Sequence, residues 1–418
     1  MKIREWHNNL QIRLIGGFFT NASLWMIMPF MVMYYNQMLG GRITAILLMI
    51  ISVVTAISYL FGGYLADRYG RYPMLRWSSF LYAIILFVFA ISFFYHPLFT
   101  FGCAVLYYIV SGLYYPAAQA IIPDTVPDEK QTEVFSIFYS FANLSVVLGS
   151  FLGGLLIVTH RVELFMVASL FHLLVALAYM KWGHETCKPE QEQHVSSWRS
   201  IVREQLNSYR LIFTHKVFLL FMTACTIITL IAIQAESLLA IYIKELFPKG
   251  IALQLFDFSP LQLKAETIFS ITIIENSILV VLFTVMVTKL IVRRLSERNV
   301  FVISSALYGA SMLYLAFTAN FVHLLIAILI LTVGEMMSAN LQMRFISRIA
   351  PDGLKAKYHA AATAQWSVAG AIAPLAILLS TQIGFTWTFF ILALLAIVAA
   401  AFYYGVYQVE GSVTDGKH

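Results

Sequence analysis

Between two long apolar runs lies the stretch Gly63-Tyr-Leu-Ala-Asp67-Arg68-Tyr-Gly70-Arg71-Tyr-Pro-Met-Leu75. It is short, carries charges of both signs, and includes glycine, which permits backbone conformations that other residues resist. Asp67 stands at the end of an apolar run. There its carboxylate can meet Arg68, Arg71 or the positive amino end of a helix. We therefore expect a tight, charged turn between two helices.

The composition places most of the protein surface in lipid. Of the 418 residues, 60% are apolar and 11% are charged, whereas a soluble protein is about 25% charged. Backbone polar groups in lipid need partners within the chain, so only helices or closed barrels can span a membrane. The apolar runs have the length of a helical span, about 20 residues. The sequence therefore predicts an all-α integral membrane protein.

The apolar runs predict twelve transmembrane helices. We place them at residues 14–35, 43–64, 74–94, 98–120, 134–158, 163–182, 217–243, 267–291, 299–319, 322–343, 358–380 and 385–408. A polar linker, residues 183–215, divides them six and six, and its residues 198–213 could form an amphipathic helix on the membrane surface. The predicted domains are an N-terminal half (1–182), the linker (183–215) and a C-terminal half (216–418). A second polar stretch, residues 244–264, separates the seventh and eighth helices.

Lysine and arginine predict the orientation in the membrane. If the amino terminus is cytoplasmic, only five of the 27 basic residues fall on the outer side: Arg42, Arg161, Lys244, Lys249 and Lys264. Basic residues are concentrated in cytoplasmic loops. We therefore expect a multi-pass protein of the cell membrane, in contact with membrane lipids, with both termini in the cytoplasm. Because topology accounts for the net charge of +6, we expect no nucleic-acid partner.

The stretch 63–75 closely resembles the signature G-x-L-a-D-r-x-G-r-k-x-x-l of the major facilitator superfamily. It departs at Tyr72, where a basic residue is usual. The two halves also resemble repeats, since Gly112-Leu-Tyr-Tyr-Pro-Ala-Ala-Gln119 and Gly334-Glu-Met-Met-Ser-Ala-Asn-Leu-Gln342 occupy equivalent places. The resemblance implies the major facilitator fold: two pseudo-symmetric six-helix halves, a substrate site between them, and transport by rocking of one half against the other.

In that family the loop latches the cytoplasmic ends of the halves. We carry this conformational-switch role to matching residues: Gly63, Asp67, Arg68, Gly70 and Arg71. The alternative is that the arginines only anchor the topology. The fifth predicted helix resembles the antiporter signature ending G-x-x-x-G-P-x-x-G-G at Gly149, Gly153 and Gly154, with Ser150 at the proline position. Close helix packing by small residues is the simpler interpretation, and the two are compatible.

Three glutamates fall inside predicted spans, namely Glu236, Glu275 and Glu335. Insertion of a charge at the bilayer centre costs about 2.5–3.5 kcal/mol, so each of these acids is expected to have a structural or functional role. A carboxyl group that is neutral when sealed and ionised when hydrated could couple transport to protons. A protonated or hydrogen-bonded structural role is the alternative. Glu335 is the deepest of the three and the leading candidate for proton coupling.

A closer resemblance is to the twelve-span drug:proton antiporters, including the lactococcal multidrug antiporter and its Gram-positive relatives. There, acids at the positions of Asp67, Asp124, Glu236 and Glu335 are linked to proton-driven switching or to cationic substrates. The resemblance therefore adds Asp124 to the proton-coupling candidates. One departure is Phe138, where the relative has an aspartate. Its loss could alter coupling or substrate charge, and Glu275 could partly compensate.

Polar and soft side chains in the spans could line a substrate cavity. The candidates are Asn21, Gln119, Phe138, Asn143, Gln234 and Met336. Polar side chains also join helices by hydrogen bonds, and methionine also fills core gaps, so packing is the alternative for each.

No motif for ATP binding, nucleophilic catalysis or metal binding is evident, so we expect no enzyme, no cofactor and no metal site. The leading prediction is a monomeric, proton-coupled secondary transporter that exports small amphipathic or cationic compounds by alternating access. Fold alone fixes neither direction nor substrate. A proton-coupled importer of a nutrient or metabolite, a lipid flippase and a non-transporting scaffold therefore remain alternatives.

Overall fold

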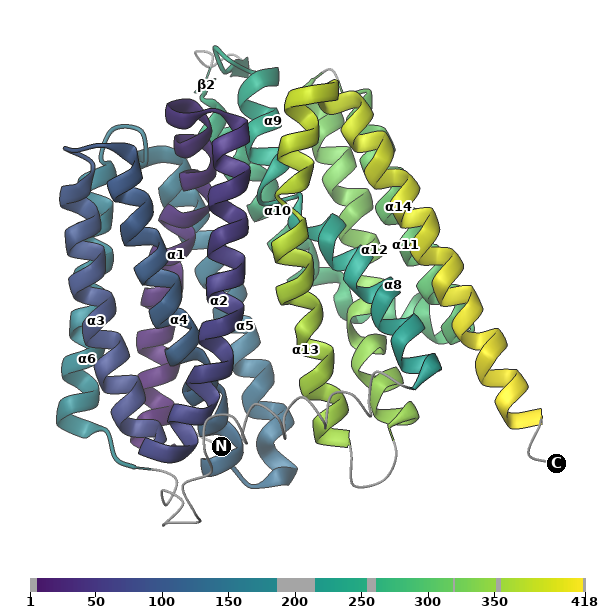
Figure 1. Ribbon diagram of the computed structural model, residues 1–418, viewed down its shortest axis with the longest axis horizontal. Helices are drawn as coiled ribbons and strands as arrows, with labels where there is room; N and C mark the ends of the chain where they lie inside the picture. Colours follow the sequence, from purple (N-terminus) through teal and green to yellow (C-terminus); the bar gives the residue numbers. More distant parts are fainter. Residues whose placement is uncertain (1–5, 186–214, 254–260, 319, 351–354, 416–418) are drawn as a thin grey trace. The chain divides into compact units, whose positions relative to one another are not determined.

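The computed structural model describes residues 6–185, 215–253, 261–318, 320–350 and 355–415 (Figure 1). The first six predicted spans are each a single helix: α1 (Asn8–Leu39), α2 (Gly41–Tyr69), α3 (Arg71–Ser92), α4 (Pro97–Thr125), α5 (Asp128–Leu156) and α6 (Arg161–Trp182). The later helices are α8 (Lys216–Ile233), α9 (Leu238–Leu246), α10 (Ala265–Leu290), α11 (Glu297–Ala316), α12 (Phe321–Ile349), α13 (Lys355–Ile372) and α14 (Leu375–Asp415), with a short 3-10 turn at Val292–Arg294. The predicted amphipathic helix at residues 198–213 lies outside the described residues.

Eleven helical segments within the described residues are long and apolar enough to cross a membrane. α13, with which the eleventh predicted span begins, is not among these eleven segments. It is less apolar because it contains Lys355, Lys357 and Gln365. Large apolar side chains such as Ile84, Phe87 and Leu174 are exposed on the helix surfaces, as expected where the solvent is lipid. The prediction of an all-α, multi-pass membrane protein is confirmed.

The chain forms two compact units. Unit 1 comprises Met1–Gln193 and Leu239–Ser277, and unit 2 comprises His194–Leu238 and Ile278–His418. The division does not follow chain order, since nearly all of α9 and the first half of α10 belong to unit 1. The predicted halves, 1–182 and 216–418, instead divide the chain at the linker.

In unit 1, α2 packs on α4, α3 on α6 and α1 on α5. The α2–α4 contact is close enough that a Cβ atom on Gly62 would collide with the carbonyl of Gly112. Small residues allow helix backbones to approach in this way in a membrane. The turn between α2 and α3, at Gly70, lies at what we call the motif end of unit 1, and the α5–α6 connection lies at its far end.

In unit 2, α11 packs on α12 and α14, and α8 packs on α13 and α14. An aromatic cluster lies between them. The Phe221 and Phe345 rings stack with centroids 4.1 Å apart, and the Phe301 and Tyr403 rings stack at 4.8 Å. Such pairs contribute packing energy beyond the area that they bury.

Two predicted spans are broken helices. The seventh is α8 followed by α9, with a turn at residues 234–237. The eleventh is α13 followed by the start of α14, with a turn at Ala373 and Pro374. Pro374 has no backbone N–H, so it cannot complete the helical ladder. A second bend, at Gly384 with φ +81°, separates the eleventh and twelfth predicted spans inside α14.

The polar stretch between the seventh and eighth predicted spans contains strand structure that the sequence analysis did not predict. β1 (Ile251–Leu253) pairs antiparallel with β2 (Leu261–Leu263), and Ile251 is opposite Leu263. Strands this short carry too weak an alternation to be read from the sequence. The strand pairing places the residues that follow α9 beside those that precede α10.

Candidate functional site

The turn between α2 and α3 is built around Gly70. Its φ of +94° and ψ of 159° lie in a region that is nearly exclusive to glycine. A Cβ atom at this position would also collide with the carboxylate of Glu185. The backbone conformation requires glycine, whereas the carboxylate of Glu185, at the end of a flexible side chain, could move aside. The turn therefore cannot form with another residue without backbone strain.

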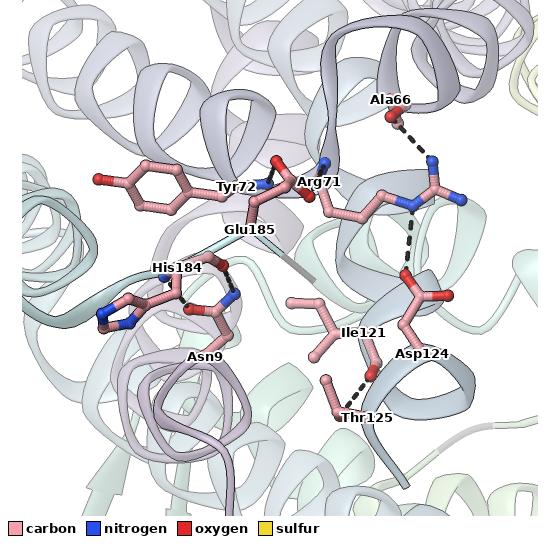
Figure 2. A network of polar contacts seen from close by, with 9 residues as sticks. All are labelled: Asn9, Ala66, Arg71, Tyr72, Ile121, Asp124, Thr125, His184 and Glu185. Carbon is pink, nitrogen blue, oxygen red and sulfur yellow. Dashed lines mark hydrogen bonds and ion pairs between the residues drawn. The ribbon is translucent and has the colours of Figure 1, made fainter. Parts of the chain in front are cut away.

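Glu185 caps the start of α3. Its Oε1 accepts the backbone N–H of Arg71 at 3.0 Å, and its Oε2 accepts that of Tyr72 at 3.2 Å (Figure 2). The first N–H groups of a helix have no partner within it, and a carboxylate suits its positive end. Glu185 was not predicted from the sequence, because it belongs to no motif and lies 114 positions from Arg71.

Arg71 joins three helices at the motif end. Its Nε lies 3.3 Å from Oδ2 of Asp124, near the end of α4, and its Nη1 donates to the carbonyl of Ala66 in α2 at 2.8 Å (Figure 2). Asp124 follows the apolar span of α4, which ends at Ile122. The structure thus places this predicted proton-coupling residue beside the switch residues.

The remaining switch residues of the loop differ in their surroundings. Arg68 is exposed, donates to the Tyr64 hydroxyl at 2.8 Å and lies over the Tyr69 ring at 5.6 Å. At Gly63 a Cβ atom would meet nothing within 4 Å, so packing does not explain this glycine. The side chain of Asp67 lies outside the described part of the structure.

The first residues after α6 are held against the start of α1. Asn9 and His184 exchange two hydrogen bonds: Nδ2 of Asn9 donates to the His184 carbonyl at 2.6 Å, and the His184 N–H donates to Oδ1 of Asn9 at 3.0 Å (Figure 2). Asn9 is fully buried. This clamp positions the neighbouring Glu185 for its contact with α3, and the sequence analysis missed it as well.

The predicted glycines of α5 face two different helices. A Cβ atom on Gly149 would collide with the carbonyl of Ala22, and one on Gly153 with that of Met26, both in α1. On Gly154 it would collide with the side chain of Ser270 in α10. These glycines therefore permit α5 to approach α1 and α10 at backbone distance.

Hydrogen bonds complete the α5–α10 contact. The Ser270 hydroxyl donates to the carbonyl of Ser150, and the Thr267 hydroxyl donates to the carbonyl of Gly154 at 2.8 Å. Ser150 occupies the place where the resembled signature has proline. Its buried carbonyl thus has a partner on α10, and the far end of unit 1 is closely packed here.

Glu236 lies in the break between α8 and α9. Glu236 has accessible surface although protein atoms surround its carboxylate, whereas the adjacent Ser237 and Leu238 are buried. Discontinuous membrane helices commonly expose charged or polar groups at sites of binding. The acid was predicted from the sequence, but the helix break around it was not.

The two helix breaks of unit 2 meet at Gln234. Its amide nitrogen donates to the carbonyl of Leu230 at 3.0 Å and to that of Ala373 at 3.2 Å. Gln234 is 1% exposed. The structure therefore gives this predicted cavity residue a bracing position, in which it binds the Ala373 carbonyl at the helix break, a carbonyl that also accepts the N–H of Ala376 at 3.0 Å.

Glu335 and Glu275 lie in different units. Glu335, half-buried in α12, is close enough to interact electrostatically with Glu236 and with Tyr308. Glu275, half-buried in α10, has a buried Oε2 without a hydrogen-bond partner in the described structure. Two of the three predicted membrane acids, Glu236 and Glu335, thus lie within electrostatic range of each other in unit 2.

Phe138 faces a cation. The guanidinium of Arg13 lies over its ring at 4.7 Å, and Nη2 of Arg13 donates to Oε1 of Gln119 at 2.9 Å. Phe138 also stacks with Trp6, with ring centroids 6.3 Å apart. Two predicted cavity residues, Gln119 and Phe138, therefore share one neighbour, Arg13, which the sequence analysis did not select.

Three other predicted cavity residues lie in packing positions. Asn21 donates to the Ser145 hydroxyl and so bridges α1 and α5. Asn143 donates to the Tyr139 carbonyl in its own helix at 2.9 Å. Met336 is 4% exposed in an apolar cluster of α10, α11 and α12. Among the described residues, no group of three or more His, Cys, Asp or Glu side chains could hold a metal ion.

Comparisons with known proteins agree with this architecture. The sequence model of the Major Facilitator Superfamily matches residues 13–249 and 247–417. The chain is 32% identical to the Na(+), Li(+), K(+)/H(+) antiporter of Planococcus maritimus, over 98% of both chains. It is 28% identical to the multidrug resistance protein MdtG of Dickeya zeae, over 58% of this chain and 59% of that one.

Solved structures share the fold. The crystal structure of the POT family transporter PepTSo aligns with a TM-score of 0.76, at 14% identity, over 97% of this chain and 98% of that chain. A peptide transporter POT in complex with sulfate aligns with a TM-score of 0.75 at 16% identity, over 96% and 94%. The family match spans nearly the whole chain, and the broken helices, glycine contacts and charged turn fit it. This chain therefore belongs to the major facilitator superfamily of membrane transporters.

Proposed function

We propose that this transporter is a proton-coupled antiporter that exports cations, either monovalent metal ions or amphipathic organic cations. The observation that carries the proposal is the pair Glu236 and Glu335. Glu236 lies in a helix break, where it has accessible surface among protein atoms, and Glu335 lies within its electrostatic range.

The chemistry of such a pair suits exchange. Two carboxylates that interact in a medium of low dielectric constant repel each other when both are ionised. A proton or a cation relieves the repulsion by neutralising one of the carboxylates. The proton and the cation therefore compete for the same negative charge. Competition of this kind exchanges protons for cations when the site is opened to the two sides of the membrane in turn.

The relatives support the cationic substrate. A protein whose name is Na(+), Li(+), K(+)/H(+) antiporter aligns with the chain over nearly its full length, and MdtG, named a multidrug resistance protein, aligns over 58% of it. The first favours monovalent metal cations and the second favours organic compounds. Both names are consistent with export, which is why we rank it above import of a nutrient.

The predicted mechanism is alternating access by two six-helix halves, residues 1–182 and 216–418, with both termini in the cytoplasm. In this proposal the network of Arg71, Asp124 and Glu185 is the cytoplasmic latch. The contact of α5 with α10 at Gly154 and Ser270 belongs to the outer seal. Protonation of Glu335 would shift the balance between the states that each contact stabilises.

Exchange can be tested in everted membrane vesicles that carry a respiratory pH gradient reported by acridine orange. We expect addition of Na⁺, Li⁺ or K⁺ to dissipate the gradient in the wild type, and ethidium efflux to report organic cations in the same vesicles. Glu236→Gln and Glu335→Gln should each reduce the exchange at least about tenfold, since each removes a negative charge from the pair.

Glu163→Gln is the matched control, because Glu163 is an exposed acid at the start of α6. It should leave the exchange unchanged. A wild type that is indifferent to all of these cations, or full exchange in both Glu236→Gln and Glu335→Gln, would refute the proposal.

A further inference from the structure

A cavity of about 380 Å³ lies at the far end of unit 1. It is enclosed by the end of α1, the connection from α5 to α6, the end of α9 and the start of α10. Its apolar wall is formed by Phe30, Met31, Met33, Ile157 and Val158. Its charged wall is formed by Arg161, Lys244, Lys249, Lys264 and Glu266.

Among the described residues, the charged wall holds more basic than acidic side chains. Nζ of Lys244 pairs with Oε1 of Glu266 at 2.8 Å. The Arg161 guanidinium lies over the ring of Tyr34 at 4.6 Å. Within the described residues, the side-chain ammonium groups of Lys249 and Lys264 make neither an ion pair nor a hydrogen bond. Four cations thus face one acid.

The β-hairpin brings the two unpaired lysines together. Ile251 is opposite Leu263 in the strand pairing, so the residues just beyond this pair, Gly250 and Lys264, are neighbours. Gly250 has φ +71° and turns the chain directly after Lys249. Lys249 and Lys264 therefore converge because of backbone geometry, although they are 15 positions apart in the sequence.

Topology does not explain this concentration of charge. Basic residues are scarce on the outer side of membrane proteins, and the predicted topology places only five there. Four of those five line this one cavity, and the fifth, Arg42, does not. Like charges brought together repel, so a cluster of this kind favours an anion that relieves the repulsion.

We propose that this cavity binds an amphipathic oxyanion: a phosphate or carboxylate held by Lys249, Lys264 and Arg161, with an apolar portion against the α1 and α5–α6 wall. Lysine and arginine both bind such groups through charge-assisted hydrogen bonds. The ligand would join the start of α6 to the end of α9 and the start of α10, and so hold the far end of unit 1 together. The source is either the headgroup of an anionic lipid or a soluble phosphate or carboxylate compound. This inference does not depend on the proposed exchange of cations.

The test is thermal unfolding of the purified full-length protein in a zwitterionic detergent, followed by intrinsic tryptophan fluorescence. The probes are inorganic phosphate, dihexanoyl phosphatidylglycerol and dihexanoyl phosphatidylcholine, each at the same ionic strength set with NaCl. A ligand at tenfold its dissociation constant should raise the unfolding midpoint by about 1–2 °C for a chain of this size.

Variants of the basic residues test whether the anion binds in this cavity. Stabilisation should be lost in Lys249→Gln/Lys264→Gln and retained in Arg42→Gln, which removes one basic residue from the same side of the membrane without touching the cavity. Stabilisation by phosphatidylglycerol alone identifies a lipid site. Stabilisation by phosphate as well identifies a site for soluble oxyanions.

Two results would overturn the inference. One is a midpoint that neither phosphate nor phosphatidylglycerol raises above the values with NaCl and phosphatidylcholine. The other is stabilisation that survives unchanged in the double lysine variant. If that variant does not fold, Lys249→Gln and Lys264→Gln are measured singly, and each should weaken the apparent affinity for the anion at least threefold.

Discussion

Nε of Arg71 lies 3.3 Å from Oδ2 of Asp124, and this ion pair fastens the start of α3 to the end of α4. The same arginine donates to the Ala66 carbonyl of α2, and its own backbone N–H is capped by Glu185. One residue therefore depends on three separate chain segments. A change in any of these segments should therefore alter the turn between α2 and α3.

Removal of the Asp124 charge should weaken transport more than stability. The Arg71–Asp124 pair is partly exposed, and pairs of this kind contribute about 0–1 kcal/mol. We expect Asp124→Asn to lower the free energy of unfolding by no more than about that amount, while it changes the rate of substrate efflux severalfold.

Efflux in Arg71→Gln/Asp124→Asn gives the check on this interpretation. If the two side chains act as a pair, the double variant should be no worse than the poorer single variant. Additive losses would mean that the residues act separately.

Gly70→Ala should be strongly destabilising. The backbone region of Gly70 costs another residue about 1–3 kcal/mol, and the new methyl group would displace the Glu185 carboxylate from the start of α3. Gly63→Ala is the matched control in the same loop, because no atom lies within 4 Å of its added Cβ and its φ is not positive. Thermal unfolding of both variants should separate them, and equal midpoints would contradict this account of the turn.

Gly153→Ala should disrupt the contact of α5 with α1. Its methyl group would meet the backbone carbonyl of Met26, which cannot move aside like a flexible side chain. Overpacking of this kind costs about 1–3 kcal/mol. Gly102→Ala, in a part of α4 where an added Cβ meets nothing within 4 Å, should be neutral. Unfolding midpoints in detergent provide the measurement, and a stable Gly153→Ala would show that the helices can separate at little cost.

The cap at the start of α1 should stabilise the protein less in acid. His7 caps it, because its Nδ1 accepts the N–H of Asn9 at 3.2 Å. Burial and the neighbouring His184 lower the pKa of His7 below its ordinary value of 6.5. The folded state thus favours the neutral form, so its contribution to stability is present above about pH 6.5 and is lost as the pH falls below it.

His7→Asn keeps a capping side chain and removes the titration. Between pH 8 and pH 5.5 the unfolding midpoint of the wild type should fall further than that of His7→Asn. Identical losses in the two proteins would exclude His7 as a source of the pH dependence.

Much of the architecture was predictable from the sequence because lipid imposes simple rules. Length and hydropathy gave the helices, and the 63–75 stretch pointed to the family. The breaks at residues 234–237 and at Ala373–Pro374 were not predicted, since a short turn hardly changes the average hydropathy of a span. Pro374 was a signal that could have been used.

The site was predictable only where a motif or a buried charge marked it. Glu236 and Glu335 stood out as acids in apolar runs, but their proximity depends on the packing of α8 and α12, which no local pattern encodes. Glu185 and Asn9 were missed because their partners are distant in the sequence. Met336 was predicted to line a cavity because its side chain is flexible and polarizable. The same properties suit a packed core equally well, and Met336 lies in one.

The most direct test of the proposed exchange uses purified protein in liposomes that contain the pH indicator pyranine and a cation such as Na⁺, diluted into cation-free buffer of equal pH with the membrane potential clamped. Antiport predicts acidification of the lumen as Na⁺ leaves, at a rate at least about tenfold lower in Glu335→Gln, while Glu163→Gln matches the wild type. A lumen whose pH does not change when each of Na⁺, Li⁺, K⁺ and ethidium is supplied in turn, or one that acidifies equally fast in Glu335→Gln, would contradict the account.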